Sequence, residues 1–171
     1  MRVRDTARVV LLDPDGRILL MKGRLPGDAD GPAFWYTVGG GLDEGERLVE
    51  AAAREVVEET GFTDVVFGPA VWRDETILPD IEGERRLFRQ VYIVAHTAGG
   101  APSRVGWLEY EHQLTEDVRW WTLEELQLTD ETVYPDGLAE LLPDVLAGRY
   151  AHEPLVIGTL DGPVRPLPRP A

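Results

Sequence analysis

Three glutamates in one short segment have the residue type and the spacing needed to bind a divalent cation. Glu55, Glu58 and Glu59 would fall within an arc of about 100° on a helix that turns roughly 100° per residue. Like charges at this spacing repel by a few tenths of a kcal/mol per pair, so the cluster is unfavourable without a cation. Magnesium takes oxygen ligands and keeps waters that can also reach a substrate phosphate. From spacing alone, however, a solvated charged face is the commoner explanation.

A guanidinium group stands beside the first of these acids. Arg54 directly precedes Glu55, and its planar fork can fix the orientation of a carboxylate and lower its pKa. Such a pair would suit an acid that has to face a metal ion. A purely structural salt bridge would produce the same pair, so both explanations stand at this point.

All of these residues are expected on one helix. Residues 47–60 are helix formers throughout, Asp43 and Glu46 resemble an N-terminal capping box, and Gly61 suits a left-handed C-terminal cap. One face of the helix should be buried and the opposite face should gather the acids. The residues expected on the buried face are Val49, Ala53, Val56 and Val57.

The helix needs a framework, and the flanking segments predict strands. Thr6–Leu12 and Arg17–Met21 are aliphatic and β-branched runs separated by Asp-Pro-Asp-Gly, which favours a hairpin. A short strand over 34–38 should lead into three consecutive glycines, 39–41, which we expect to break regular structure. The other expected elements are a loop over 25–33, strands at Val65–Val71, Leu87–His96 and Val118–Trp121, a short helix from Thr122 to Leu126, and a helix over 137–146 that Pro143 kinks or divides.

A single domain accounts for most of the chain. At 171 residues and 43% hydrophobic content, the chain suits one globular unit with a full core, which we place over 1–153. Residues 154–171 contain five prolines and are expected to form an extended strap or a disordered tail. No apolar stretch suits a signal peptide or a membrane span of roughly 20 residues, so we expect a cytoplasmic protein that does not bind membranes.

Charge and composition narrow the ligand and the chemistry. The 17 basic and 31 acidic residues give a net charge of −14, which repels long nucleic acids and anionic membranes. A small phosphate ester can still bind if metal ions neutralise it. The absence of cysteine excludes disulfides, thiolate zinc sites and cysteine nucleophiles, and the sequence has no HExxH, P-loop or nucleophile-elbow pattern.

The 23 residues from Gly40 to Phe62 form a longer pattern that resembles the Nudix box. That pattern is Gly, five residues, Glu, seven residues, Arg-Glu, an aliphatic residue, any residue, Glu-Glu, any residue, Gly and an apolar residue. All nine specified positions are matched without a gap, which makes the resemblance specific. One departure precedes the box, where Val38 stands at a position that is often proline in the family. The matching residues are Gly40, Glu46, Arg54, Glu55, Val56, Glu58, Glu59, Gly61 and Phe62.

The resemblance implies a fold and roles for particular residues. The fold would be the Nudix α/β/α sandwich, with a mixed β-sheet and the catalytic loop-helix-loop. Glu55, Glu58 and Glu59 would act as metal ligands or base, the Gly39 carbonyl as a further ligand, and Arg54 as an orienting cation. The expected cofactor is Mg²⁺, with Mn²⁺ as a substitute. The implied reaction is attack of metal-activated water on phosphorus in a nucleoside diphosphate linked to another group.

Two further sets of residues are expected around this core. Many Nudix enzymes add a glutamate from a loop outside the box, and Glu116 is the first candidate, with Glu109 and Glu111 as rivals. For the anionic substrate, the expected contacts are Lys22, Arg24 and Arg89. The sequence does not choose among a nucleoside triphosphate, a nucleotide sugar, a dinucleoside polyphosphate and a capped RNA end, and it leaves a homodimer open.

An alternative from another functional class is a catalytically inactive Nudix-fold sensor that binds a nucleotide without turnover. Such sensors arise when residues of the box decay. Here every glutamate of the box is present, which favours the enzyme.

Overall fold

The chain folds around one mixed β-sheet of seven strands, and the computed structural model describes residues 1–158. The strands lie in the order β6-β2-β3-β1-β5-β4-β7, so β1 and β5 are central. They are parallel to each other over ten residue pairs, from Val3↔Leu87 to Leu12↔His96. The strands are β1 (Val3–Leu12), β2 (Ile18–Gly23), β3 (Phe34–Gly41), β4 (Val66–Pro79), β5 (Arg85–His96), β6 (Thr115–Trp121) and β7 (Leu155–Val156).

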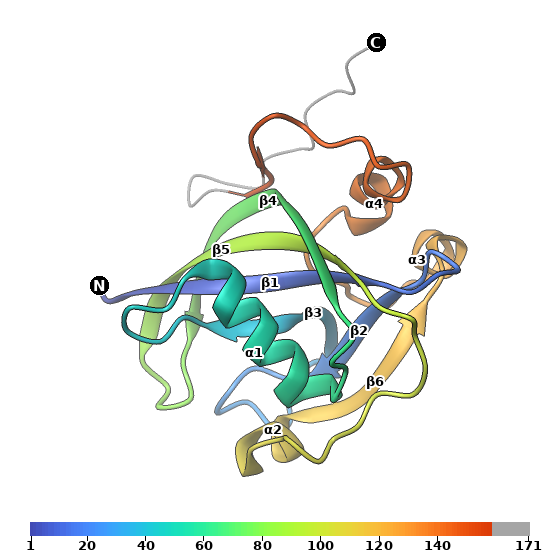
Figure 1. Cartoon of the computed structure of the whole chain (residues 1–171). Helices are drawn as coiled ribbons and strands as arrows, with labels where there is room; N and C mark the ends of the chain where they lie inside the picture. The colour runs from blue at the N-terminus through green and yellow to red at the C-terminus, as the bar shows by residue number, and fades with distance from the viewer. Residues whose placement is uncertain (159–171) are drawn as a thin grey trace.

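Helices cover both faces of this sheet, which confirms the predicted α/β sandwich (Figure 1). On one face, alternate residues of the central strands pack against α1 (Leu48–Thr60). On the other face, they pack against α3 (Leu123–Leu128) and α4 (Leu138–Leu146). This division follows from the period of two in a strand, which sends Val9 to the α1 side and Val10 to the α4 side.

The predicted hairpin is present only at its turn. β1 and β2 are antiparallel but pair only at Leu12↔Ile18. Beyond that point β3 lies between them, pairing with Val9 of β1 and with Leu20 of β2. A two-strand hairpin would leave one edge of each strand without partners, and inserting β3 gives both strands a second hydrogen-bonded neighbour.

The expectation that Gly39, Gly40 and Gly41 break regular structure was wrong. They continue β3 to its end and pair with Arg8, Ala7 and Thr6 of β1. Gly39 has φ of +143°, and a Cβ there would collide with the Ala7 carbonyl oxygen. Glycine is therefore required because it lets the bent strand lie close to its neighbour.

Helix α1 begins and ends almost where expected, but a different face is buried. Gly61 has φ of +77° and its N–H donates to the Val57 carbonyl, which confirms the predicted cap. At the start, the Asp43 N–H donates to Glu46 as expected, but this contact closes the turn before the helix, and the helix itself is capped at Arg47, whose N–H donates to Glu50. The side chains turned inward are Ala51, Ala52, Glu55, Val56 and Glu59, whereas Val49 and Val57 are exposed.

This inward face corrects the expected separation of an apolar face from an acidic one. Glu55 and Glu59 point toward the sheet, where Gly40 leaves space for the Glu55 carboxylate and the Gly39 N–H donates to Glu59. Glu58 lies nearer the solvent, with 43% of its side chain exposed. The glutamates therefore occupy the junction between helix and sheet and not an outer surface.

Several boundaries also differ from expectation. β4 extends to Pro79, well beyond the expected Val71, and a short helix that was not expected, α2 (Glu109–Leu114), precedes β6. Pro143 does not divide α4, which is one continuous helix. The start of the proline-rich segment lies along β4 as the parallel strand β7, and the rest of the expected strap or tail, from 159 on, lies outside the described residues.

Candidate active site

Glu59 is anchored to the glycine end of β3. Its Oε1 accepts a 2.8 Å hydrogen bond from the Gly39 N–H, and the residue is only 4% exposed. The backbone carbonyl of Glu59 accepts a 2.7 Å hydrogen bond from the indole Nε1 of Trp107. Helix α1 therefore presents this acid at a position fixed from both sides.

Glu55 lies one turn earlier, against Gly40. A Cβ on Gly40 would collide with its carboxylate, and the residue is 8% exposed. Oε1 of Glu55 accepts a 2.8 Å hydrogen bond from Nη1 of Arg54. The two buried acids therefore lie on consecutive turns of α1, with Glu59 against Gly39 and Glu55 against Gly40.

Arg54 connects three parts of the site. Its Nε and Nη2 donate to the two carboxylate oxygens of Glu46 at 2.9 Å each, and Nη2 also donates to the Gly41 carbonyl at 3.0 Å. Nη1 contacts Glu55 at 2.8 Å and Glu58 at 3.5 Å. A planar guanidinium is suited to this task because each nitrogen points in a fixed direction. Arg54 is therefore in contact with Glu46 and Glu55, and its orienting role stays a prediction.

The pKa values of the buried acids Glu55 and Glu59 are raised, whereas the pKa of Glu46 is lowered. Desolvation raises the pKa of Glu59 well above its ordinary value, and the negative charge of Glu55 raises it further. Burial also raises the pKa of Glu55, against the hydrogen bond from Arg54. By contrast, the Arg54 hydrogen bonds lower the pKa of Glu46 to about 2. Two neighbouring buried carboxylates with raised pKa values form a site that a cation would stabilise.

The donor set fits a hard divalent cation. All candidate ligands are oxygens, and burial of Glu55 and Glu59 without a full complement of counter-charge is costly unless a cation compensates. Within residues 1–158, no three Asp, Glu or His side chains are already gathered as a complete metal cage. Two buried carboxylates are thus in place, and Glu58 and the Gly39 carbonyl are the nearby oxygens that could complete the shell.

The segment before β6 brings a further acid toward the site. Ser103 N–H donates to the Thr60 carbonyl, and Gly106 packs on the backbone of Glu58, so this segment is attached to the end of α1. Helix α2 follows it, and the negative charge of Glu111 contributes to the raised pKa values of both Glu55 and Glu59. The Glu111 carboxylate also accepts a 2.7 Å bond from the Leu108 N–H.

Glu116, the acid favoured from sequence, is engaged elsewhere. It lies on β6 and forms an ion pair with Arg24, so two residues expected in the site neutralise each other. Of the three acids considered, Glu111 is the one whose charge is among the main causes of the raised pKa values of Glu55 and Glu59.

The other two expected substrate contacts are also paired with acids. Lys22 Nζ lies 2.8 Å from Glu131 Oε1. Arg89 forms a two-pronged pair with Asp5, at 2.7 and 2.8 Å. These cations are therefore at least partly neutralised before any substrate arrives.

Sequence reasoning missed Arg8, which lies directly beside the site. Its Nη1 donates to the Gly39 carbonyl at 3.3 Å, and its positive charge lowers the pKa of Glu59 against the effect of burial. The available signal was a single charged residue inside the otherwise uncharged run from Thr6 to Leu12. A charged residue is rarely buried in a central strand unless it has a partner or a functional role.

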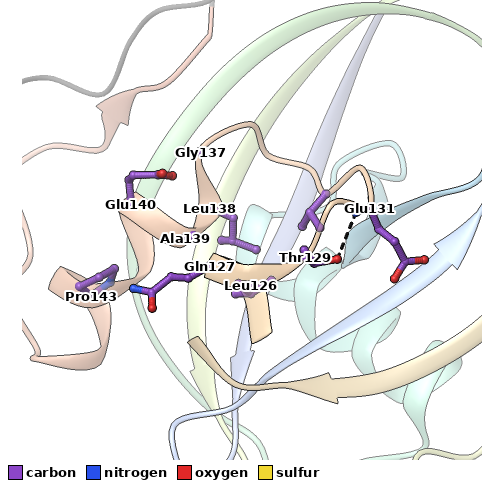
Figure 2. Close-up of a pocket in the computed structure, with 10 residues that line it drawn as sticks. Leu126, Gln127, Thr129, Glu131, Gly137, Leu138, Ala139, Glu140 and Pro143 are labelled. Atoms are coloured by element: carbon purple, nitrogen blue, oxygen red, sulfur yellow. Dashed lines mark hydrogen bonds between the residues drawn. The ribbon is translucent and has the colours of Figure 1, made fainter. Parts of the chain in front are cut away.

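A hollow of about 440 Å³ lies on the other side of the sheet, between α3 and α4. Figure 2 shows the side chains of Leu126, Leu138 and Glu140 around it, together with the Glu131 N–H bonded to Thr129. None of the helix glutamates lines this hollow. The position of the candidate active site is therefore indicated by the carboxylates of α1 and not by this hollow.

Comparisons with known proteins agree with this geometry. A sequence model of the NUDIX domain matches residues 2–144. An RNA pyrophosphohydrolase of Caulobacter vibrioides is 35% identical over 140 residues, covering 77% of this chain and 77% of that protein. Another, from Novosphingobium aromaticivorans, is 37% identical over 105 residues, covering 56% of this chain and 63% of that protein.

Solved structures show the same architecture. A MutT NUDIX hydrolase from Burkholderia pseudomallei has a TM-score of 0.56 and 26% identity, covering 85% of this chain and 99% of that one. A UDP-X diphosphatase has a TM-score of 0.60 and 19% identity, covering 91% of this chain and 68% of that one. At that identity the second likeness concerns the fold alone.

Proposed function

Because the chain belongs to the Nudix hydrolase family, we propose that it uses magnesium to cleave the phosphoanhydride bond of a nucleoside diphosphate linked to another group. The observation that carries this proposal is the pair of buried carboxylates, Glu55 and Glu59, held over Gly39 and Gly40. A structural acid would not be buried next to a second acid without compensation. The pair supports a site built to receive divalent cations.

The cations would be held by Glu55, Glu58 and Glu59 with the Gly39 carbonyl, and manganese could replace magnesium. Bound there, the metal would polarise the substrate phosphates and offset the charge that builds up on the leaving group. The chain's own task is positioning. Arg54 fixes the direction of Glu55 through Nη1, and the Gly39 N–H fixes Glu59 through Oε1.

A base for the attacking water has two candidates in the described residues. Glu55 has a pKa raised by burial, which brings it closer to neutral pH, where a general base works best. Glu111 lies on α2, close enough for its charge to act on Glu55 and Glu59. We favour Glu111 over Glu116 as the additional acid, because Glu116 is paired with Arg24.

A small nucleotide is the substrate class that the charge of the protein favours. A net charge of −14 opposes the approach of a long polyanion, whereas one diphosphate can be neutralised by the metal ions it brings. The 35% identity to an RNA pyrophosphohydrolase supports a second candidate, the 5′-terminal pyrophosphate of an RNA.

A hydrolysis screen separates these candidates. The purified chain would be incubated with magnesium and with nucleoside triphosphates, nucleotide sugars, dinucleoside polyphosphates, and capped or 5′-triphosphorylated RNA, followed by product identification. Turnover in H₂¹⁸O would show which phosphorus is attacked. Glu59→Gln should be inactive, and Glu44→Gln, at an exposed acid outside the site, should retain activity. Tight nucleotide binding without turnover on any substrate would instead establish the sensor alternative.

A further inference from the structure

Arg8 is a partly buried cation without an acidic partner, in a protein with nearly twice as many acids as bases. Its guanidinium contacts are Nε to Gln90 Oε1 at 2.7 Å and Nη1 to the Gly39 carbonyl at 3.3 Å. Across residues 1–158, Arg8 forms no ion pair within 4.0 Å, a property it shares with Arg2, Arg4, Arg73, Arg85 and Arg104, whereas Arg17, Arg24, Arg54, Arg86 and Arg89 each have an acidic partner. Both hydrogen-bond acceptors of Arg8 are uncharged, and its charge acts on Glu59 and Asp74 without an ion pair to either.

The amide of Gln90 lies between Arg8 and Asp74. Gln90 receives Arg8 at its oxygen and donates through Nε2 to Asp74 Oδ1 at 2.8 Å. Asp74 is held on its other oxygen by the Tyr92 hydroxyl at 3.1 Å. If Gln90 were an acid, Arg8 would be neutralised. The amide instead fixes the direction of the guanidinium and leaves its charge available.

The position of Arg8 places this charge at the catalytic end of the sheet. In the β1–β3 register, Arg8 lies opposite Gly39, and in the β1–β5 register it lies opposite Tyr92. Val10, the next residue on the same face of β1, belongs to the core under α4, and Arg8, two positions earlier on that face, is only partly buried. Its Nη2 has no hydrogen-bond partner in the described part of the chain.

We propose that Arg8 is a substrate-binding residue, which contacts a phosphate oxygen of the bound diphosphate while Gln90 holds it in place. The inference rests on the proposed function and adds a named contact on the side of Gly39 opposite α1. Phosphate is the ligand that this geometry favours, because a guanidinium with an unused edge matches two phosphate oxygens. The helix acids and the metal would hold the diphosphate from one side, and Arg8 would hold it from the other.

A binding experiment without turnover tests this contact. The probe is methylenediphosphonate, whose bridging carbon cannot be hydrolysed, titrated calorimetrically into the full chain with excess magnesium. We expect Arg8→Gln to weaken binding about tenfold and to reduce the salt dependence of the affinity. Arg8→Lys keeps the charge but loses the fork, and should weaken binding about threefold. Gln90→Leu, which removes the hold on the guanidinium, should fall between wild type and Arg8→Gln.

Arg149→Gln is the matched control, because it removes the same charge from an exposed arginine paired with Asp144 beyond α4. It should bind the probe within twofold of wild type. The proposal is overturned if Arg8→Gln binds as tightly as wild type, if both arginine variants weaken binding equally, or if the wild-type chain does not bind the probe. If Arg8→Gln does not fold, the affinity of Arg8→Lys for the probe is the test. An affinity equal to that of wild type then overturns the proposal. Hydrolysis of natural substrates is measured separately, so the proposed function and this contact can fail independently.

Discussion

The Gly39 N–H and Glu59 Oε1 are joined by a 2.8 Å hydrogen bond that connects the end of β3 to the end of α1. The carbonyl of the same glycine accepts a hydrogen bond from Arg8. One residue in the sheet thus contacts an acid on one side and a cation on the other. This relationship explains why the acids of the helix point inward, and it leads to several measurable consequences.

Glu59→Gln should abolish turnover while apo stability stays level or rises slightly. The glutamine Oε1 can still accept from the Gly39 N–H, but the charge that burial disfavours is removed. Because the folded-state pKa of Glu59 is raised, its contribution to stability is fully present below the unfolded value and is lost as pH rises through the folded pKa. Thermal unfolding in EDTA from pH 4 to 8 should show a smaller loss for the variant. A large loss of apo stability with activity retained would make the acid structural.

Arg54→Lys should reduce kcat about tenfold or more while changing substrate affinity much less. Lysine keeps the charge, but one ammonium cannot reach Glu46, Glu55 and the Gly41 carbonyl together. Steady-state kinetics of the variant, beside a direct measurement of nucleotide binding, separates the two effects. Kinetics identical to wild type would mean that Arg54 does not orient the site.

The Glu46–Arg54 pair should make a contribution to stability that disappears in acid. Because Arg54 lowers the pKa of Glu46 to about 2, the contribution is present above the unfolded value and is lost as pH falls through the folded pKa. Glu46→Gln should therefore melt below wild type at pH 7, and the gap should close between about pH 4.5 and pH 2. Melting temperatures across this range provide the check, and a gap independent of pH would assign the effect to packing.

Among the acids before β6, Glu111→Gln should cost turnover the most, at roughly the hundredfold expected of a general base. Glu109→Gln and Glu116→Gln should have smaller effects, although the latter releases Arg24 from its ion pair. The three variants would be compared at saturating magnesium. Circular dichroism would check that Glu111→Gln keeps its helix content, because Glu111 also accepts a hydrogen bond from the Leu108 N–H at the start of α2. Near-native turnover in all three variants would leave the chemistry to the helix alone.

Gly39→Ala should destabilise the fold by more than about 2 kcal/mol and abolish activity, because strain at positive φ adds to overpacking against β1. The added Cβ would collide with the Ala7 carbonyl. Gly83→Ala is the control, since Gly83 has φ of +81° but no atom within 4 Å of a Cβ. Urea unfolding should show a clearly smaller loss for Gly83→Ala. Equal losses would mean that φ alone matters at Gly39.

Much of this protein could be predicted from the sequence because the deciding information is local. Helix formers over 47–60 and Gly61 at the cap specify α1 within a residue, since helix propensity and capping act over a few residues. The spacing of Glu55, Glu58 and Glu59 indicates the chemistry, because residues three and four apart are neighbours on any helix.

Only the tertiary structure decided where those residues face and what they meet. The insertion of β3 between β1 and β2 depends on pairing between distant segments, and so do the contacts of Glu59 with Gly39 and of Glu55 with Gly40. The cations nominated from sequence are paired with acids up to 109 positions away along the chain, as Lys22 is with Glu131. Arg8 forms no ion pair among the described residues and bonds instead to Gln90 and to the Gly39 carbonyl. Charge pairing is a property of neighbours in space, and a single sequence does not contain those distances.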